Sequence, residues 1–298
     1  MCIRDRFQII NMIKEKMVSI KDLKGGLRLK GVKKLNSFEK PLISIITTTF
    51  NSGNTLNETL YSILEQNYKN YELIIVDGGS SDNTLQIIKN NEDKIDYWIS
   101  QKDEGIYDGF NKGLKLAKGC YVGFVNSDDV LKSNALNILT KYHKEFPNID
   151  FIFGSVEKHW GVLYGYKPWK INFSWGFYSS HSCGFFIKRN SAEKIGDYDT
   201  QFRHHADWDY FYRMIKIHKL RGVGTKKNEI FGKFRRGGFS SKLKFIDSIS
   251  ETIKIRKKNG QNTIFIFLIS IFRFIKNLDK IQNIKKDIFL IIKLCFFN

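Results

Sequence analysis

The chain has 298 residues, of which 42% are hydrophobic, and it carries a formal net charge of +19 at pH 7. This length and apolar content fit one large domain, or one domain with appendages. The charge indicates an anionic partner such as a membrane leaflet or a polyanion. Because no zinc-finger, helix-turn-helix or ribonucleoprotein motif accompanies it, we expect no nucleic acid partner.

The cysteines are widely spaced and form no C-x-x-C pair: Cys2, Cys120, Cys183 and Cys295. This spacing excludes a zinc ribbon and a disulfide framework, and it favours a reducing cytosol. The charged opening, residues 1–6, is not followed by a long apolar segment, so no secretory signal peptide is expected. We leave these opening residues out of the fold prediction.

Strand and helix patterns alternate from Pro41 onward. The β-branched run 42–49 predicts a strand, and the leucine spacing over 56–64 predicts a helix. The apolar run 73–76 predicts a second strand. Asp82 is then a candidate N-cap for a helix that buries Leu85 and Ile88.

The same alternation continues through the next fifty residues. Residues 95–99 predict a short strand, the spacing over 106–114 predicts a helix, and residues 121–125 predict another strand. Gly119 is expected to end the helix as a left-handed C-cap. Helices between strands of this length indicate βαβ units and a mostly parallel sheet.

Carboxylates follow two of these predicted strands. Run 73–76 leads into Asp77-Gly78-Gly79-Ser80-Ser81-Asp82, and run 121–125 leads into Asn126-Ser127-Asp128-Asp129. Ligands collect at the carboxyl ends of strands in open α/β sheets, and oxygen-rich clusters suit Mg²⁺ or Mn²⁺ better than zinc. Neither a Rossmann glycine fingerprint nor a Walker A sequence is present. The pattern therefore predicts an α/β metal-nucleotide site.

Four stretches in this order resemble the family-2 glycosyltransferases with the GT-A fold: residues 45–51, 76–82, 103–113 and 126–129. The Asp-Gly-Gly-Ser turn and the Gly-Ile-Tyr-Asp stretch are especially similar to the subgroup that makes colanic-acid-like and other bacterial surface polysaccharides. The resemblance implies a Rossmann-like, mostly parallel central sheet flanked by helices. It divides the chain into a basic N-terminal extension (1–40), a GT-A domain (41–241) and a basic, amphipathic helical tail (242–298).

The resemblance also assigns a donor site. Asp77 matches an acid that contacts the nucleotide base or ribose, and residues 126–128 occupy the D-x-D position with Asn126 in place of the first Asp. Asp128 is then the metal ligand for Mg²⁺ or Mn²⁺, with Asp129 as its substitute or support. The residues expected to bind the nucleotide-sugar are Thr49, Asn51, Asp77, Gly78, Asn111, Lys112, Asn126, Ser127, Arg235 and Arg236. The two arginines belong to a stretch resembling a loop that closes over the donor; the alternative is a solvated basic stretch.

An inverting sugar transfer needs a base that takes the proton of the acceptor hydroxyl. The resemblance and the Asp-x-Asp-aromatic spacing give this role to Asp207, with Asp209 as the fallback on the acceptor side. Residues two apart on a helix diverge by about 200°, so only one of the two can face the site. The alternative for Asp207 is a simple N-cap beside a buried Trp208.

The histidines receive less specific predictions. His181 resembles a histidine on the acceptor side, and its alternative is a hydrogen-bonded core residue. Adjacent His204 and His205, together with His218, have no ligand spacing for zinc, so surface or packing roles are expected.

Two apolar runs, 263–274 and 288–297, lie in the Lys-rich tail. Neither reaches the roughly 20 residues that a membrane-spanning helix needs. They are interpreted either as interfacial helices with Lys and Arg at anionic headgroups, or as a helical pair packed across the catalytic domain. The basic segment 21–40 is a second candidate for the same leaflet.

The sequence therefore predicts an inverting, metal-dependent glycosyltransferase of the hexosyltransferase type. It would move sugar from a nucleotide-diphosphate donor, a UDP-sugar, to a lipid-linked or growing glycan in bacterial surface polysaccharide biosynthesis. We expect a cytoplasmic protein bound peripherally to the inner face of the cell membrane. A sugar nucleotidyltransferase and a non-catalytic membrane- or polyanion-binding protein on the same fold remain alternatives.

Overall fold

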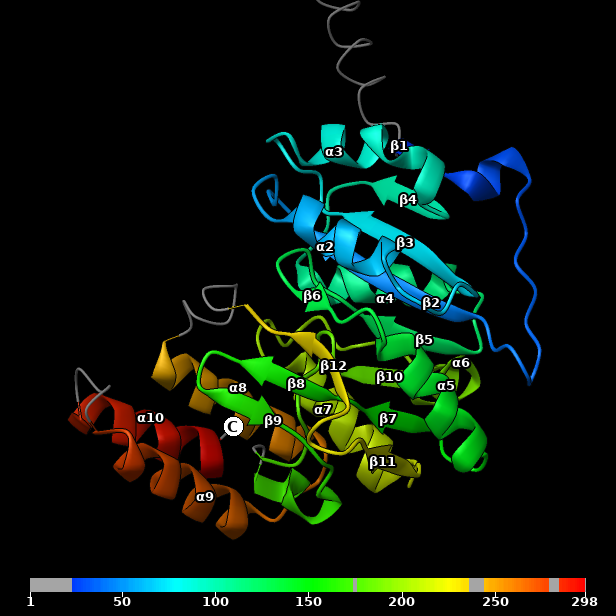
Figure 1. Ribbon diagram of the computed structural model, residues 1–298. Coiled ribbons are helices and arrows are strands. Elements are labelled where there is room, and N and C mark those ends of the chain that lie inside the picture. The colour runs from blue at the N-terminus through cyan, green and yellow to red at the C-terminus, as the bar shows by residue number, and fades with distance from the viewer. Residues whose placement is uncertain (1–22, 174–175, 236–243, 279–283, 298) are drawn as a thin grey trace, which may run out of the picture.

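The computed structural model describes residues 23–173, 176–235, 244–278 and 284–297, and the structural statements below refer to these residues. They form two sheets and a set of helices (Figure 1). The strands are β1 (Leu23–Gly25), β2 (Ile43–Thr49), β3 (Tyr71–Asp77), β4 (Tyr97–Ser100), β5 (Tyr121–Phe124), β6 (Val130–Leu131), β7 (Phe151–Phe153), β8 (Ser155–Lys158), β9 (Gly161–Leu163), β10 (Phe185–Lys188), β11 (Gly222–Gly224) and β12 (Ile230–Lys233). The α-helices are α2 (Leu56–Leu64), α3 (Thr84–Asn90), α4 (Ile106–Leu116), α5 (Ala135–Glu145), α6 (Arg189–Ile195), α7 (Ala206–Tyr212), α8 (Phe245–Lys258), α9 (Thr263–Lys276) and α10 (Ile284–Phe296). Shorter helical turns are η1 (Leu27–Lys30), η2 (Glu92–Lys94), η3 (Pro168–Phe173) and η4 (Arg213–Ile217).

The main sheet has the strand order β1-β4-β3-β2-β5-β10-β7-β11, and the smaller sheet has the order β6-β12-β8-β9. Within the main sheet β2 runs parallel to β3 and β5, β3 runs parallel to β4, and β7 runs parallel to β11. Only β1 and β10 run antiparallel to their neighbours. The predicted α/β fold with a mostly parallel central sheet is confirmed.

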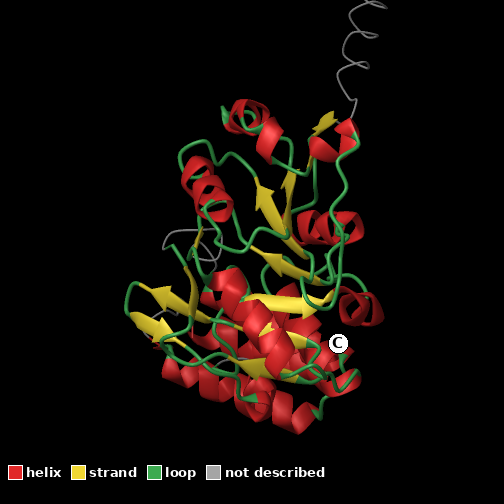
Figure 2. Ribbon diagram, turned by 45° about the vertical axis from the view of Figure 1, so that its right-hand side comes forward, coloured by secondary structure: helices red, strands yellow, loops and turns green. Residues whose placement is uncertain are grey.

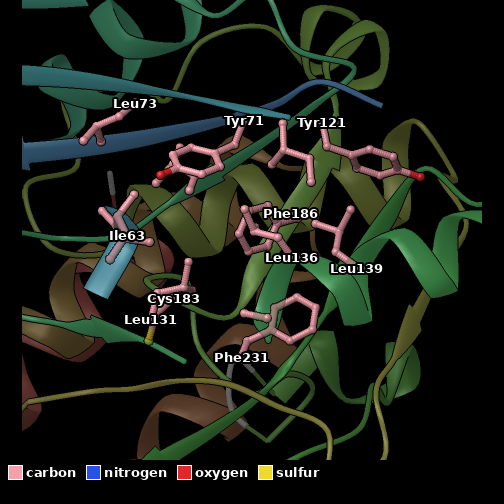
Figure 3. Close-up of a cluster of buried hydrophobic side chains, with 14 of the residues drawn as sticks. Ile63, Tyr71, Leu73, Tyr121, Leu131, Leu136, Leu139, Cys183, Phe186 and Phe231 are labelled. Atoms are coloured by element: carbon pink, nitrogen blue, oxygen red, sulfur yellow. The ribbon is translucent and has the colours of Figure 1, made fainter. Parts of the chain in front are cut away.

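Helices cover both faces of the main sheet (Figure 2). Successive strand residues point to opposite faces, so Ile45 and Leu73 pack with helices α2, α3 and α5, whereas Ile46 and Ile74 pack with α4, α6 and α7. Figure 3 shows the first of these two layers, with Ile63 among its side chains. Burial on both faces explains why β2 and β3 read as continuous apolar runs.

The predicted strands and helices between residues 42 and 125 all form, but two helix ends differ from expectation. Helix α3 has Asn83 at its N-cap, and the Asp82 carboxylate instead accepts a hydrogen bond from the Thr84 N–H at 3.0 Å. Helix α4 ends one turn earlier than Gly119, with Ala117 in an extended conformation. The predicted left-handed cap at Gly119 is wrong: a Cβ there would lie 2.6 Å from the Ser44 backbone nitrogen, so close approach to β2 requires the glycine.

Residues 23–40 pack against the edge and ends of the main sheet. β1 pairs with β4, Arg28 forms an ion pair with the buried Glu72, and Lys34 contacts the buried Asp96 at 2.8 Å. Leaving either carboxylate without its cation would be strongly destabilising. Figure 1 places β1 at the opposite end of the molecule from α9 and α10. The described residues of segment 21–40 are therefore tied to the α/β domain, and its contact with the same leaflet as the tail stays a prediction.

The C-terminal helices α8, α9 and α10 form a basic helical extension with a small core of its own, around Ile253, Ile266 and Ile291. Helix α8 also contacts the α/β domain, because the Arg256 guanidinium donates to the Asn172 carbonyl at 2.6 Å and lies 4.8 Å from the centre of the Trp208 ring. Helices α9 and α10, which carry the two apolar runs, pack with α8, and whether they also meet a membrane stays a prediction. Among the described residues, no helix combines the length and the apolar character that crossing a bilayer requires.

Candidate functional site

Three loops meet at the carboxyl ends of β2, β3 and β5. The Asn51 N–H donates to Ser80 Oγ at 2.8 Å, and the hydroxyl groups of Ser52 and Ser127 lie 2.7 Å apart. Thr48 Oγ1 lies 3.4 Å from Asn126 Oδ1. These contacts join segments that are 29 to 78 residues apart in the chain. The structure therefore brings the predicted strand-end residues to one edge of the main sheet.

Asn51 and Thr49 shape the β2 side of this edge. Asn51 has φ 48°, and its side-chain oxygen accepts from the Ser81 N–H at 2.9 Å. Asparagine tolerates such a left-handed conformation better than most residues. Thr49 is buried, pairs with Asp77 in the β-ladder, and its Oγ1 has no hydrogen-bond partner among the described residues.

Asp77 is fully buried and holds the turn after β3. Its carboxylate accepts the Ser80 N–H at 3.1 Å, the Ser80 hydroxyl at 2.5 Å and the Ser100 hydroxyl at 2.6 Å. A nucleotide contact to Asp77 has to compete with these three donors. The carboxylate preorganises the Gly78–Ser80 backbone at the edge of the sheet.

Asp103 is a residue to which sequence reasoning gave no role. A Cβ on Gly78 would lie 2.6 Å from Asp103 Oδ2, so the glycine leaves room for this half-buried carboxylate. Burial raises the pKa of Asp103, and Lys112 opposes that shift. Lys112 itself forms an ion pair with Asp108 at 3.0 Å. The sequence could have indicated Asp103 by its position, because it follows a predicted strand, as Asp77 does.

Asn111 and His181 have structural roles in place of the predicted ligand contacts. The Asn111 side-chain nitrogen donates to the Tyr198 carbonyl at 2.9 Å, and its side-chain oxygen accepts from the Tyr198 N–H at 2.8 Å. His181 is buried, and its Nε2 lies 2.8 Å from the Tyr198 hydroxyl. Its ring stacks on Phe110 and Phe124, and burial lowers its pKa to about 3. His181 is therefore the neutral core residue of the alternative prediction, and its acceptor-side assignment is wrong.

Asp128 and Asp129 lie in the loop between β5 and β6. Burial raises the pKa of both carboxyl groups, that of Asp129 to about 7, and the charge of Asp128 contributes to the latter shift. Asp129 Oδ1 accepts from the Arg235 N–H at 2.8 Å, while its buried Oδ2 has no hydrogen-bond partner among the described residues. Two crowded carboxylates with an orphan oxygen have the donor chemistry that suits a hard divalent cation. Within the described ranges, no cluster of three or more acidic, histidine or cysteine side chains is placed to hold a metal ion.

Arg235 and Arg236 begin the stretch that resembles the donor loop. The Arg235 guanidinium forms an ion pair with Glu58 on α2, and its charge opposes the raised pKa of Asp128. Arg236 and the Gly237-Gly238 pair lie outside the described residues. Arg235 therefore contacts two elements: its guanidinium pairs with Glu58 on α2, and its backbone N–H binds Asp129 in the acidic loop after β5.

Asp207 lies in the first turn of α7 and is half-buried. Tyr107 donates its hydroxyl to Oδ1 at 3.1 Å, Tyr178 donates to Oδ2 at 3.4 Å, and the Trp208 N–H donates to Oδ1 at 2.8 Å. Burial raises its pKa to about 6, against the opposing effect of these donors. His205, not Asp207, occupies the N-cap position, so the simple capping alternative is wrong. Tyr107 lies in the first turn of α4, and Asp103 lies in the loop just before that helix, so the Tyr107 contact ties Asp207 to the start of α4.

Asp209 points into the protein instead. It is fully buried and receives the Arg213 Nε at 2.9 Å, the Lys258 Nζ at 3.2 Å and the Asn259 Nδ2 at 2.8 Å. Its carboxylate therefore fastens α8 to α7. The prediction that Asp209 lies on the acceptor side or replaces the base is wrong.

The histidine pair before α7 belongs to the same junction. His205 Nε2 lies 2.8 Å from the Ser248 hydroxyl, and burial lowers the pKa of His205 to about 4. The His204 N–H is bound by the Glu251 carboxylate at 3.0 Å. The predicted packing role is confirmed for His205.

A mostly parallel α/β sheet with carboxylates at its strand ends agrees with the GT-A type of transferase. Residues 44–211 match the sequence profile of glycosyl transferase family 2, which is more than half of the chain. The protein belongs to this family.

The relatives with similar sequences are named as glycosyltransferases. A PGL/p-HBAD biosynthesis glycosyltransferase of Mycobacterium bovis is 30% identical over 187 residues, covering 58% of this chain and 69% of that protein. The poly(ribitol-phosphate) beta-N-acetylglucosaminyltransferase TarP of Staphylococcus aureus is 42% identical over 117 residues, covering 38% of this chain and 36% of TarP. The second alignment therefore spans only about a third of its relative.

The fold agrees with a solved structure. Staphylococcus aureus TarS 1–349 in complex with UDP matches with a TM-score of 0.62 and 16% identity, covering 85% of this chain and 80% of that one. The same protein has also been solved with UDP-GlcNAc. At this identity the likeness establishes the GT-A fold alone.

Proposed function

We propose that this protein is an inverting glycosyltransferase of the hexosyltransferase type that uses a nucleotide-diphosphate sugar, a UDP-sugar, and extends a glycan of the bacterial cell surface. One observation carries the proposal: Asp207 is a half-buried, doubly tyrosine-bonded carboxylate tied through Tyr107 to the helix that follows Asp103. Residues 41–241 would carry the catalytic domain. The family assignment supports the reaction class.

Asp207 is the proposed general base. With a pKa raised to about 6, the carboxylate is ionised at neutral pH yet more basic than an exposed aspartate. The acceptor hydroxyl gives its proton to Asp207 while its oxygen forms a bond to the anomeric carbon. The bond from that carbon to the diphosphate breaks with inversion, and the nucleoside diphosphate leaves with the electron pair.

Asp128, supported by Asp129, is the proposed ligand of Mg²⁺ or Mn²⁺. A bound cation would supply positive charge against the donor diphosphate. The under-neutralised carboxylates support this role, and Asn126 in place of a third acid weakens it. Arg235 and Arg236 would add positive charge as the nucleoside diphosphate departs.

Donor and acceptor follow from chemistry and from the relatives. The UDP and UDP-GlcNAc complexes of TarS support a UDP-sugar, for which Thr49, Asn51, Gly78, Asp103 and Lys112 are the proposed binding residues. The names of the relatives support a cell-surface glycan as acceptor. We propose a lipid-linked acceptor and a peripheral position on the inner face of the membrane.

A screen of nucleotide sugars against the purified full-length chain tests the proposal. Thermal stability measured with and without Mn²⁺ is expected to rise most with UDP-sugars, and the matching sugar should be transferred with release of UDP. Release of pyrophosphate would identify a nucleotidyltransferase instead. Absence of any nucleotide-dependent shift would favour the non-catalytic binding protein and overturn the proposal.

A further inference from the structure

Helix α9 is apolar on both of its faces. On the inner face Ile266, Ile269 and Phe274 are buried in the core of the helical extension. On the outer face large side chains recur at spacings of four, four and three residues, which lie along one side of a helix. These outer residues and their exposed fractions are Ile264 at 63%, Leu268 at 60%, Phe272 at 57% and Ile275 at 60%.

Such a stripe is costly to leave in water. Burying a side chain of this size contributes free energy in proportion to the apolar area removed from solvent, and contiguous exposed patches mark interaction sites. A helix that is apolar all round is normally covered on every side. Helix α10 adds Phe289, which is 68% exposed, and lies beside α9 at the outer end of the molecule (Figure 1).

The charge around the stripe selects the partner. Residues 263–278 and 284–297 contain five basic side chains and one acidic side chain, Asp287. Four of the basic residues are Lys276, Lys285, Lys286 and Lys293, whereas the fifth, Arg273, turns inward and donates to Thr252 Oγ1 of α8 at 2.9 Å. A second copy placed face to face would bring eight lysines together, whereas anionic headgroups would neutralise them. Lysine stems can lie along the apolar surface with their charged ends at the headgroups.

We propose that the outer face of α9, with Phe289 of α10, docks in the plane of an anionic phospholipid bilayer. The reason for such docking rests on the proposed transfer to a lipid-linked acceptor. The exposed residues that support it lie on α9 and α10, outside the candidate active site. Helix α9 has 14 residues and lies flat in the interface without crossing it.

The docking face is fixed relative to the candidate base. Lys258 and Asn259 at the end of α8 bind Asp209 on α7, and Arg256 lies against both Trp208 and the Phe265 ring of α9. Trp208 follows Asp207 directly. Docking through α9 therefore sets the orientation of α7 towards the bilayer, which suits an acceptor anchored there.

Vesicle sedimentation of the full-length chain tests the docking face. Wild type is expected to sediment with vesicles of phosphatidylcholine and phosphatidylglycerol, and far less with phosphatidylcholine alone. The double variant Leu268→Glu/Phe272→Glu should bind the mixed vesicles at least about tenfold more weakly. Leu35→Glu, at an 84% exposed leucine of the N-terminal segment, is the matched control and should bind as wild type does.

Three outcomes would overturn the inference: no vesicle binding by wild type, equal binding by the double variant, or wild-type dimers that the double variant abolishes. The thermal shift with UDP, measured on each variant, reports folding and donor binding separately. A double variant that keeps the UDP shift but loses vesicle binding supports docking. If wild type binds vesicles but shows no thermal shift with UDP, the docking face is supported and the proposed function is contradicted.

Discussion

The two sides of helix α7 hold carboxylates with opposite surroundings. Asp207 is half-buried, meets two tyrosine hydroxyl groups and has no cationic partner at ion-pair distance among the described residues. Asp209 is fully buried and meets Arg213 and Lys258. Residues two apart on a helix point in nearly opposite directions, so one sequence motif presents the proposed base on one side and a structural carboxylate on the other. The partners of a carboxylate, more than its type, decide its role.

The largest effect is expected at Asp207. Asp207→Asn removes the base while keeping the shape and the Tyr107 contact, so the transfer rate at pH 7.5 should fall by about 10²- to 10⁴-fold. The thermal shift with UDP should persist. UDP release in the presence of acceptor measures the rate, and Asp93→Asn, at an exposed residue of η2, is the matched control. A wild-type rate would remove Asp207 from the chemistry.

Substitution of Asp209 should lower the stability of the fold. Asp209→Ala leaves Arg213 and Lys258 without their carboxylate and Asn259 without an acceptor, which should lower the free energy of unfolding by about 3 kcal/mol. Urea unfolding measures this loss. Lys258→Ala should cost less, because its side chain is 40% exposed and solvent screens the pair. If Asp209→Ala were as stable as wild type but inactive, the division of roles on α7 would be reversed.

Asp128 should show a smaller catalytic effect. Asp128→Ala is expected to reduce the transfer rate with Mn²⁺ by at least about tenfold, and chelation with EDTA should have little further effect on the variant. Asp93→Ala controls for the loss of an exposed acid. Full activity of Asp128→Ala together with EDTA sensitivity would move the cation to other ligands.

The smallest effect is a shift in pH dependence. The Tyr107 hydroxyl stabilises the charged form of Asp207, so Tyr107→Phe should raise the pKa of Asp207 and move the acidic limb of the rate profile upward by less than about one pH unit. Tyr178→Phe, which removes a longer contact of 3.4 Å, should shift it less. An unchanged limb in both variants would mean that another group titrates.

Much of the fold could be predicted, because apolar runs between turn residues report burial directly. Continuous runs such as 73–76 predicted strands covered on both faces, and the positions of Asp77 and Asp128 after such runs predicted that they would share an edge. Gly119 was misread because its neighbour, the Ser44 backbone, lies 75 residues away. Local pattern cannot reveal a close approach between distant segments.

The site was harder to predict for the same physical reason. Asn111 and His181 take their structural roles from Tyr198, which lies 87 and 17 residues away. Asp209 takes its role from Lys258 in the tail, 49 residues downstream. A motif defines which groups are present, whereas tertiary partners decide which of them remain available to a ligand.

The pH dependence of sugar transfer tests most directly whether Asp207 is the catalytic base, because its raised pKa predicts the direction in which the rate changes with pH. Below about pH 6 Asp207 is protonated and cannot act as a base, so the wild-type rate should fall as the pH decreases through 6. The same shift means that the native state binds the proton more tightly than the unfolded chain does, so Asp207 lowers stability as the pH rises from about 4 to 6. Rates of UDP-sugar transfer from pH 4.5 to 8, for wild type and Asp207→Asn, are therefore expected to show an acidic limb near 6 that the variant lacks. An Asp207→Asn profile that matches wild type in both rate and limb would contradict the account.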